Sequence, residues 1–95
     1  MTNPEDSKHQ QLVDIVAEHI NKDWLIWKNM VYDKGEIDII AYKKGKVKIY
    51  EIKSHDHYDK AKEQLLRAKN YVKHAFQADR IWMVYVSNEE VKRVR

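Results

Sequence analysis

The stretch from Glu36 to Lys53 constrains the fold of this 95-residue chain more than any other feature. Apolar and polar residues alternate on both sides of Lys44-Gly45, and such alternation is typical of strands that bury one face. Glycine in a two-residue turn supplies the positive φ that a tight hairpin needs. The sequence therefore predicts a β-hairpin in which the numbers of paired residues add up to 89.

This register places Asp38 directly opposite Glu51, and Glu36 opposite Lys53. The predicted face with the carboxylates also carries Ile40, Ile49, Tyr42 and Val47, and the opposite face carries Ile37, Ile39, Tyr50 and Ile52. Two carboxylates whose β-carbons lie about 5 Å apart repel each other, so the pair needs a compensating charge. Two other interpretations stay open: a three-residue bulged turn that would offset the pair, and an exposed strand end with ordinary surface ion pairs.

A hard divalent cation would remove the repulsion, because Mg²⁺ and Mn²⁺ take carboxylate oxygens as ligands. Asp38 and Glu51 are the predicted ligands, and the backbone carbonyl of Ile52 can add another. Lys53 follows Glu51 by two residues on the same face, within reach of a metal-bound water or a phosphate oxygen. This set predicts metal-assisted hydrolysis of a phosphodiester, with one metal ion or two.

Two helices are expected on either side of the predicted strands. Asn3-Pro4 and a second pattern, Ser7-x-x-Gln10, each resemble a helix start, and the first helix should run to about residue 21. Residues 57–77 contain neither Gly nor Pro, and their apolar residues recur on one helical face.

Two further strands are expected at residues 24–32 and 81–86. The first is rich in aromatic and β-branched residues, and the second is a continuous apolar run, as in a strand covered on both faces or at a subunit contact. The order of helix, three strands, helix and strand indicates one α/β domain over residues 1–95. Its core should span about 7–87, followed by a basic tail at 88–95.

Composition narrows the function classes. The absence of cysteine excludes disulfides and thiolate metal sites. No apolar run approaches the roughly 20 residues of a membrane span, and the polar N-terminus is unlike a secretory signal, so we expect a cytoplasmic protein. Residues 1–42 carry a net charge of −4 and residues 43–95 one of +7. The basic half is the surface that would meet a polyanion, but such charge is also typical of an ordinary solvated face, and charge alone does not decide between the two. The expected contacts to nucleic acid are Lys43, Lys44, Lys46, Lys62, Lys69 and Lys73.

The pair Ile37-Asp38, followed thirteen positions later by Glu51-Ile52-Lys53, resembles the PD-(D/E)XK nuclease motif. The resemblance is to archaeal Holliday-junction resolvases and to small bacterial nuclease-like proteins with a GEID-type strand. It implies a restriction-endonuclease-like αβββαβ core, in which helices flank a mixed sheet. It also implies an endonuclease that cuts DNA with Mg²⁺ or Mn²⁺, with Asp38 and Glu51 as metal ligands and Lys53 as the catalytic lysine.

The same resemblance draws attention to the two helices. Gln64 matches a glutamine often found after the motif strand, and Tyr71 resembles a tyrosine that follows it at a shorter spacing. Many relatives place a metal-binding glutamate on the first helix, where this chain has Gln10 or Gln11, next to His9. Glu18 or Asp14 could substitute for it, because both lie on much the same helical face as Gln11. Without such an acid, full nuclease activity is in doubt.

Three functions are therefore open. The first is a DNA endonuclease, with RNA an open alternative as substrate, in the form of a homodimer that binds no nucleotide cofactor. The second is a nucleic-acid-binding protein of the same fold without efficient cleavage. The third is a small assembly module in which the acidic and basic halves of different copies attract each other.

Overall fold

The computed structural model describes residues 4–88 and 90–94, and it confirms the α/β class and the predicted order of elements. The elements are α1 (Pro4–His19), β1 (Leu25–Tyr32), β2 (Gly35–Lys43), β3 (Lys46–Ile52), α2 (Tyr58–Ala75), β4 (Arg80–Val86) and β5 (Val91–Val94). Strand β5 is an addition, formed within the predicted basic tail. Ser7 lies inside α1 instead of capping it, and Asn3 falls outside the described residues.

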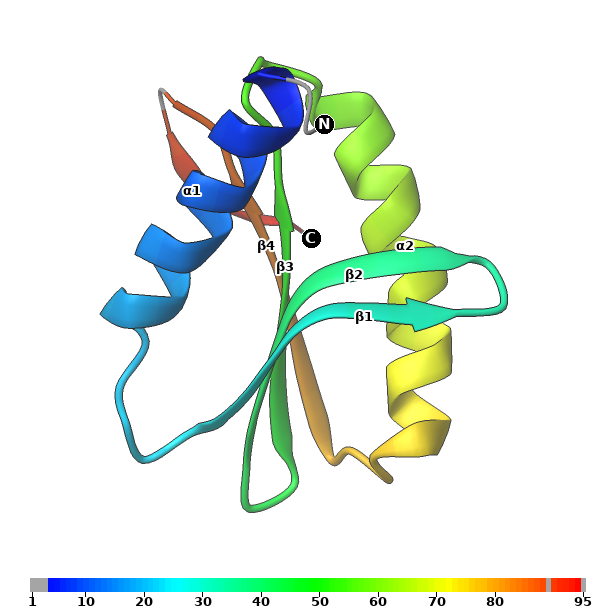
Figure 1. Cartoon of the computed structure of the whole chain (residues 1–95). Coiled ribbons are helices and arrows are strands. Elements are labelled where there is room, and N and C mark those ends of the chain that lie inside the picture. The colour runs from blue at the N-terminus through cyan, green and yellow to red at the C-terminus, as the bar shows by residue number, and fades with distance from the viewer. Residues whose placement is uncertain (1–3, 89, 95) are drawn as a thin grey trace.

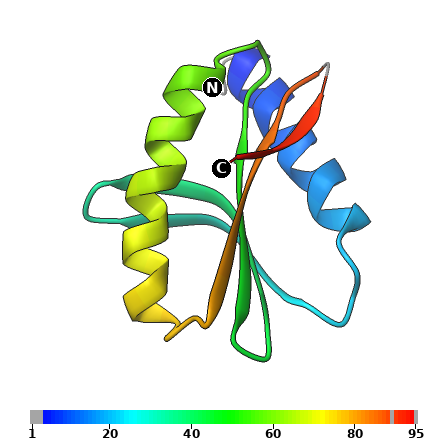
Figure 2. The same cartoon turned by 180° about the vertical axis from the view of Figure 1, so that it is seen from behind.

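The five strands form one mixed sheet in the order β1-β2-β3-β4-β5. Strands β1, β2 and β3 are antiparallel to their neighbours, β4 runs parallel to β3, and β5 is antiparallel to β4. Because parallel strands need a crossover, α2 connects β3 to β4 across one face of the sheet. Helix α1 covers the other face, and the β1–β2 hairpin curves toward α2 (Figure 1). Seen from behind, β5 lies beside β4 at the edge of the sheet (Figure 2).

Each helix packs on one face of the sheet and buries a separate apolar cluster there. On the α2 side the helix buries Ala61, Leu65, Ala68 and Val72 against strand residues such as Ile40 and Ile49. On the α1 side Val13 packs among residues that include Ile39, Ala41, Tyr50 and Ile52. Neither helix in the described ranges is both long and apolar enough to cross a bilayer.

The turn of the β2–β3 hairpin has the predicted length and register. Lys43 pairs with Lys46, and the ladder continues to Ile39 opposite Tyr50. Lys44 has a φ of 47° and Gly45 a φ of 80°, as in the two-residue turns that match strand twist. A β-carbon on Gly45 would also lie 2.5 Å from Asp79 Oδ2, so both backbone and space require glycine. The bulged three-residue turn is thereby excluded.

The strict alternation of the two faces fails at the other end of β2. Ile37 belongs to the same cluster as Ile40 on the α2 side, whereas Ile39 belongs to the α1 side. The prediction that Ile37 shares a face with Ile39 is wrong. On the neighbouring strand, Asn29 lies between the pairs Lys28–Ile39 and Met30–Ile37 and has a φ of 55°. A positive φ inside a strand changes its local twist, and side chains on the paired strands shift face with it.

Strand β4 is an inner strand. Met83 and Tyr85 belong to the cluster under α2, while Val84 and Val86 pack on the α1 side, which confirms that β4 is covered on both faces. On one edge β3 pairs along residues 80–86, and on the other β5 pairs along residues 83–86. The alternative that this run lies at a subunit contact stays a prediction.

Candidate active site

The two predicted carboxylates lie where β2 and β3 stop pairing. The ladder ends at Ile39 opposite Tyr50, one step before the expected pair of Asp38 and Glu51. In place of a further backbone bond, the Ile52 N–H donates to Asp38 Oδ2 at 2.8 Å. Asp38 is 4% exposed and Glu51 is 5% exposed. The structure thus brings both acids to one buried position, held by the backbone of the motif strand.

Lys53 completes this group. Its Nζ lies 3.1 Å from Glu51 Oε1, and its side chain is only 19% exposed. The Lys53 backbone N–H donates to Val86 O at 2.9 Å, which holds the end of the motif strand against β4. The predicted set of Asp38, Glu51 and Lys53 is therefore brought together. We call this group the carboxylate site.

Burial opposes the ionisation of both acids, and their mutual repulsion adds to this effect at Glu51. Burial raises the pKa of Glu51 to about 8, and the neighbouring Asp38 adds to the rise, while Lys53 opposes it. Burial also raises the pKa of Asp38, against the lowering effects of the Ile52 N–H and His9. One lysine thus does not neutralise the pair, and a further cation would stabilise both charged forms.

Helix α1 reaches the site through a residue that the sequence analysis did not select. His9 Nε2 lies 3.3 Å from Asp38 Oδ2. Glu18 is exposed and follows His9 by nine residues, about 13 Å along a helix, so the structure does not bring it to the site. Asp14 pairs instead with Lys28 at 3.0 Å. The signal that could have found His9 was its place beside the expected acid position.

Of the two supporting residues, Glu36 lies away from Lys53. Glu36 is exposed and accepts a hydrogen bond from Asn29 Nδ2 at 3.0 Å, so the predicted pairing of Glu36 with Lys53 is wrong. Gln64 lies on α2 beside the buried Leu65, and its Oε1 is buried with no hydrogen-bond partner among the described residues.

The six lysines expected to contact nucleic acid form two groups, one at the β2–β3 turn and one on α2. Lys43, Lys44 and Lys46 surround the β2–β3 turn, and Lys46 is five residues from Glu51, on the order of 16 Å along a strand. On α2, Lys62, Lys69 and Lys73 follow one another at helical spacing on one flank. Tyr58 shares that flank and contacts Tyr85 of β4 and Lys92 of β5. These α2 lysines thus face the β4–β5 edge.

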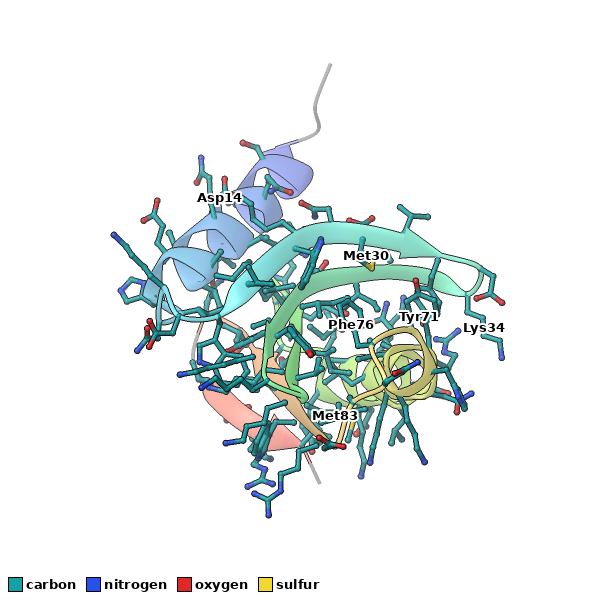
Figure 3. The ribbon with its side chains drawn as sticks, turned by 90° about the horizontal axis from the view of Figure 1, so that it is seen from below. Asp14, Met30, Lys34, Tyr71, Phe76 and Met83 are labelled. Atoms are coloured by element: carbon teal, nitrogen blue, oxygen red, sulfur yellow. The ribbon has the colours of Figure 1, made fainter. Side chains whose placement is uncertain are left out.

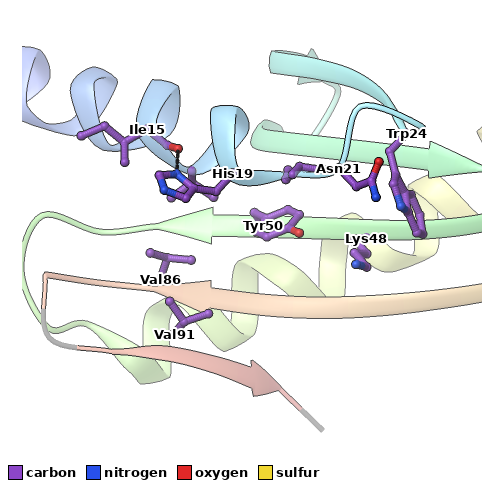
Figure 4. A pocket seen from close by; sticks show the side chains of 10 residues that line it. Ile15, His19, Asn21, Trp24, Lys48, Tyr50, Val86 and Val91 are labelled. Carbon is purple, nitrogen blue, oxygen red and sulfur yellow. Dashed lines mark hydrogen bonds between the residues drawn. The ribbon is translucent and has the colours of Figure 1, made fainter.

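A separate cavity of about 610 Å³ lies between α1 and the sheet (Figure 4). Its lining is largely apolar, with Ile15, Trp24 and Val91 among the residues, and it contains no acid. Its cation, Lys48, already lies 4.6 Å from the centre of the Trp24 ring. This cavity is therefore distinct from the carboxylate site in chemistry.

The candidate site is inferred from its geometry alone. No protein-family model and no curated protein matches this chain. Among residues 4–88 and 90–94, no three His, Asp or Glu side chains are placed to share one metal ion. The donor set that the structure offers is thus Asp38, Glu51 and the Ile52 backbone, with His9 beside Asp38.

Proposed function

We propose that this protein is a divalent-cation-dependent nuclease that hydrolyses a phosphodiester bond of DNA. The observation that carries the proposal is the convergence of Asp38, Glu51 and Lys53 at the open end of the β2–β3 ladder. Two buried acids at one point lower the stability of the folded state, because burial and repulsion both oppose their ionisation. Such groups are concentrated at functional sites.

The residues present fit Mg²⁺ or Mn²⁺. Both ions prefer carboxylate oxygens and keep several bound waters, so two acids and a backbone carbonyl are enough ligands from the protein. The raised pKa of Glu51 supports the fit, since a cation favours the charged form of a carboxyl group that burial disfavours. Asp38, Glu51 and the Ile52 carbonyl would hold the ion.

The chain's own groups then have separate roles in hydrolysis. A bound cation supplies acidity to a water and stabilises negative charge on the phosphate. Lys53 carries its positive charge beside Glu51 and would donate to the attacking water or to a phosphate oxygen. The Ile52 N–H keeps Asp38 Oδ2 in place, and His9 holds the same oxygen from the side of α1. The backbone of the motif strand thereby orients Asp38, and Lys53 is not needed for that purpose.

A nucleic-acid-binding protein without efficient cleavage is the second candidate. The observation that favours it is the position of the two expected acids of α1, since neither Glu18 nor Asp14 reaches the pair and His9 lies beside Asp38. Such a protein would bind DNA with or without a divalent cation, and its affinity would fall steeply with salt.

A cleavage panel tests the nuclease. Purified protein is incubated with linear duplex, branched and single-stranded DNA, and with RNA, in Mg²⁺, in Mn²⁺ and in EDTA. We expect cation-dependent products that disappear in Asp38→Asn and in Lys53→Ala. Asparagine keeps an oxygen to accept the Ile52 N–H, so Asp38→Asn should fold, and its circular dichroism melt should stay close to that of the wild type.

Matched controls remove the same charges elsewhere. Glu18→Gln removes an exposed acid of α1 and Lys22→Ala an exposed lysine of the turn after α1, and both should cleave like the wild type. Intact substrates with the wild-type protein in every condition would exclude the nuclease. Metal-independent binding of those intact substrates would then support the second candidate.

We also propose that the protein is a homodimer, since a chain of 95 residues buries a small core and gains stability from a second copy. Sedimentation equilibrium measures this directly. A monomer across the concentrations used for cleavage would exclude the dimer without affecting the chemistry of the carboxylate site.

A further inference from the structure

A pocket of about 520 Å³ lies between the tip of the β1–β2 hairpin and one flank of α2. Tyr32 and Lys34 line it from the hairpin, and Arg67, Tyr71 and His74 line it from the helix. Figure 3 shows Lys34 and Tyr71 on the side of the molecule where the hairpin overhangs α2. Cavities of roughly 300–1,000 Å³ are the size that holds small ligands. We call this cavity the hairpin pocket.

The aromatic part of the hairpin pocket is a stacked pair. The rings of Tyr32 and Tyr71 have centroids 4.8 Å apart and planes at 30°. Both residues are partly exposed, and both contribute to the lining. A flat ring at the end of such a stack can continue it, as nucleobases do on aromatic side chains.

The charged part is cationic. Lys34 and Arg67 line the pocket together with His74, against one acid, Asp33. Among the residues that the structure describes, none of these three basic side chains forms an ion pair, whereas Lys28, Lys43 and Lys53 each do. Arginine and lysine beside aromatic rings are the combination that holds a phosphate and a base together.

The hairpin pocket lies within electrostatic range of the carboxylate site. The charges of Arg67 and Glu51 both act on the Tyr32 hydroxyl, Arg67 lowering its pKa and Glu51 raising it, although burial is the main cause of its raised pKa. Gln64 precedes Arg67 by one helical turn on the same flank of α2, and Tyr71 follows one turn later. The pocket is thus on the α2 flank opposite to Lys62, Lys69 and Lys73.

We propose that the hairpin pocket binds one nucleotide of single-stranded DNA beside the scissile phosphate. The proposal rests on the nuclease function proposed above and names its substrate class. Arg67 and Lys34 would contact the phosphate, and the base would extend the stack of Tyr32 and Tyr71. A base inside a duplex is paired and stacked on its neighbours, so it cannot offer its face to a concave site. Single strands or frayed ends are therefore the substrates that fit.

Binding in EDTA tests this pocket separately from cleavage. Fluorescence anisotropy is measured with labelled dT10 and with a labelled hairpin duplex at the same low salt. We expect dT10 to bind more tightly than the duplex, and Arg67→Ala to weaken dT10 binding about tenfold, in line with an arginine that contacts both phosphate and ring. The matched control is Lys22→Ala, which removes one exposed cation from the turn after α1, outside both the hairpin pocket and the expected lysine contacts, and should change the affinity less than about twofold.

Two further arms examine the base and the source of the nucleotide. Tyr71→Leu should reduce the quenching of 2-aminopurine placed in the oligonucleotide, and circular dichroism verifies its fold. Free dTMP at the same nucleotide concentration should displace dT10 far less than unlabelled dT10 does. Equal displacement would assign the pocket to free nucleotides and overturn the strand proposal.

The outcomes separate the pocket from the nuclease. Equal losses in Arg67→Ala and Lys22→Ala, or duplex bound as tightly as dT10, would overturn the pocket even if Asp38→Asn abolishes cleavage. A loss confined to Arg67→Ala, with no cleavage by the wild type, would retain the pocket as a single-strand binding site and remove the nuclease.

Discussion

The two ends of the β2–β3 hairpin are built from the same two strands and behave differently. At the turn, every pair from Lys43–Lys46 to Ile39–Tyr50 follows the ladder, and side chains keep to their faces. At the open end the ladder stops, Ile37 changes face, and two acids are buried with one lysine. The regular end stabilises the sheet, while the irregular end concentrates charge at a cost in stability.

The contrast between the two ends shows where reactive side chains can gather in a small domain. A regular ladder satisfies every backbone group and leaves no donor for a side chain. Only where β2 departs from β3 is the Ile52 N–H free to hold Asp38, and only there can α1 approach through His9. The reactive side chains thus gather at the place where β2 stops pairing with β3.

The largest predicted effect concerns Glu51 and pH in the cation-free protein. Its folded pKa of about 8 lies above the unfolded value of 4.5, so the folded state holds a proton that the unfolded state has released between these values. The free energy of unfolding should therefore fall as pH rises from 4.5 through 8, by on the order of 4 kcal/mol. Urea unfolding in EDTA at pH 5 and pH 8.5 measures it.

Glu51→Gln should be much less sensitive to pH over this range, because glutamine does not titrate. Glu63→Gln, an exposed acid of α2, should keep the full wild-type loss. Mn²⁺ or Mg²⁺ should restore stability at pH 8.5 to the wild type and not to Glu51→Gln, since a ligand stabilises only the state that binds it. A wild-type protein whose stability is constant from pH 5 to pH 8.5 contradicts the strained carboxylate site.

The sequence predicted the regular end of the hairpin and only part of the irregular end. Alternation and Lys44-Gly45 determine the turn and its register, because both are local properties of the chain. The convergence of Asp38, Glu51 and Lys53 followed from that register. The change of face at Ile37 did not, because it depends on Asn29 of the neighbouring strand, whose φ of 55° leaves no mark in the alternation of β2.

The contribution of α1 to the site could not be predicted for a similar reason. Helical spacing indicates which residues of α1 face the sheet, such as Val13, but not how far along the sheet each one lies. That distance selects His9 and excludes Glu18. Strand β5 was missed because its four residues, three of them exposed, lack any apolar alternation.

At the regular end, Gly45→Ala should cost about 2 kcal/mol, since it adds backbone strain at φ 80° and a contact with Asp79 that must move. Gly35→Ala is the control at the β1–β2 turn, where φ is 143° and no atom lies within 4 Å of the added β-carbon. It carries only the backbone strain and should cost less. Equal losses in chemical denaturation would show that the Asp79 contact has no weight.

At the irregular end, His9→Glu places an acid where α1 meets Asp38. Carboxylate is a better ligand for Mg²⁺ than imidazole, so cation affinity measured by calorimetry should rise about tenfold, or roughly 1.4 kcal/mol. A third negative charge should also lower the stability of the cation-free protein. Glu18→Gln should change neither quantity. Unchanged affinity in His9→Glu would place α1 outside the metal's reach.

The smallest effect is expected at Lys44, which has a φ of 47° in the tight turn. Lysine adopts this left-handed region at a cost, whereas asparagine tolerates it well and is favoured before glycine in such turns. Lys44→Asn should therefore raise the free energy of unfolding by about 0.5 kcal/mol. Asn29 has nearly the same φ at the other end, so Asn29→Lys should lower stability by more, because it also removes the hydrogen bond to Glu36. Equal and opposite changes in the free energy of unfolding would contradict this expectation. The conformation of Asn29 and its hydrogen bond to Glu36 would then add no stability beyond the preference of asparagine for a positive φ.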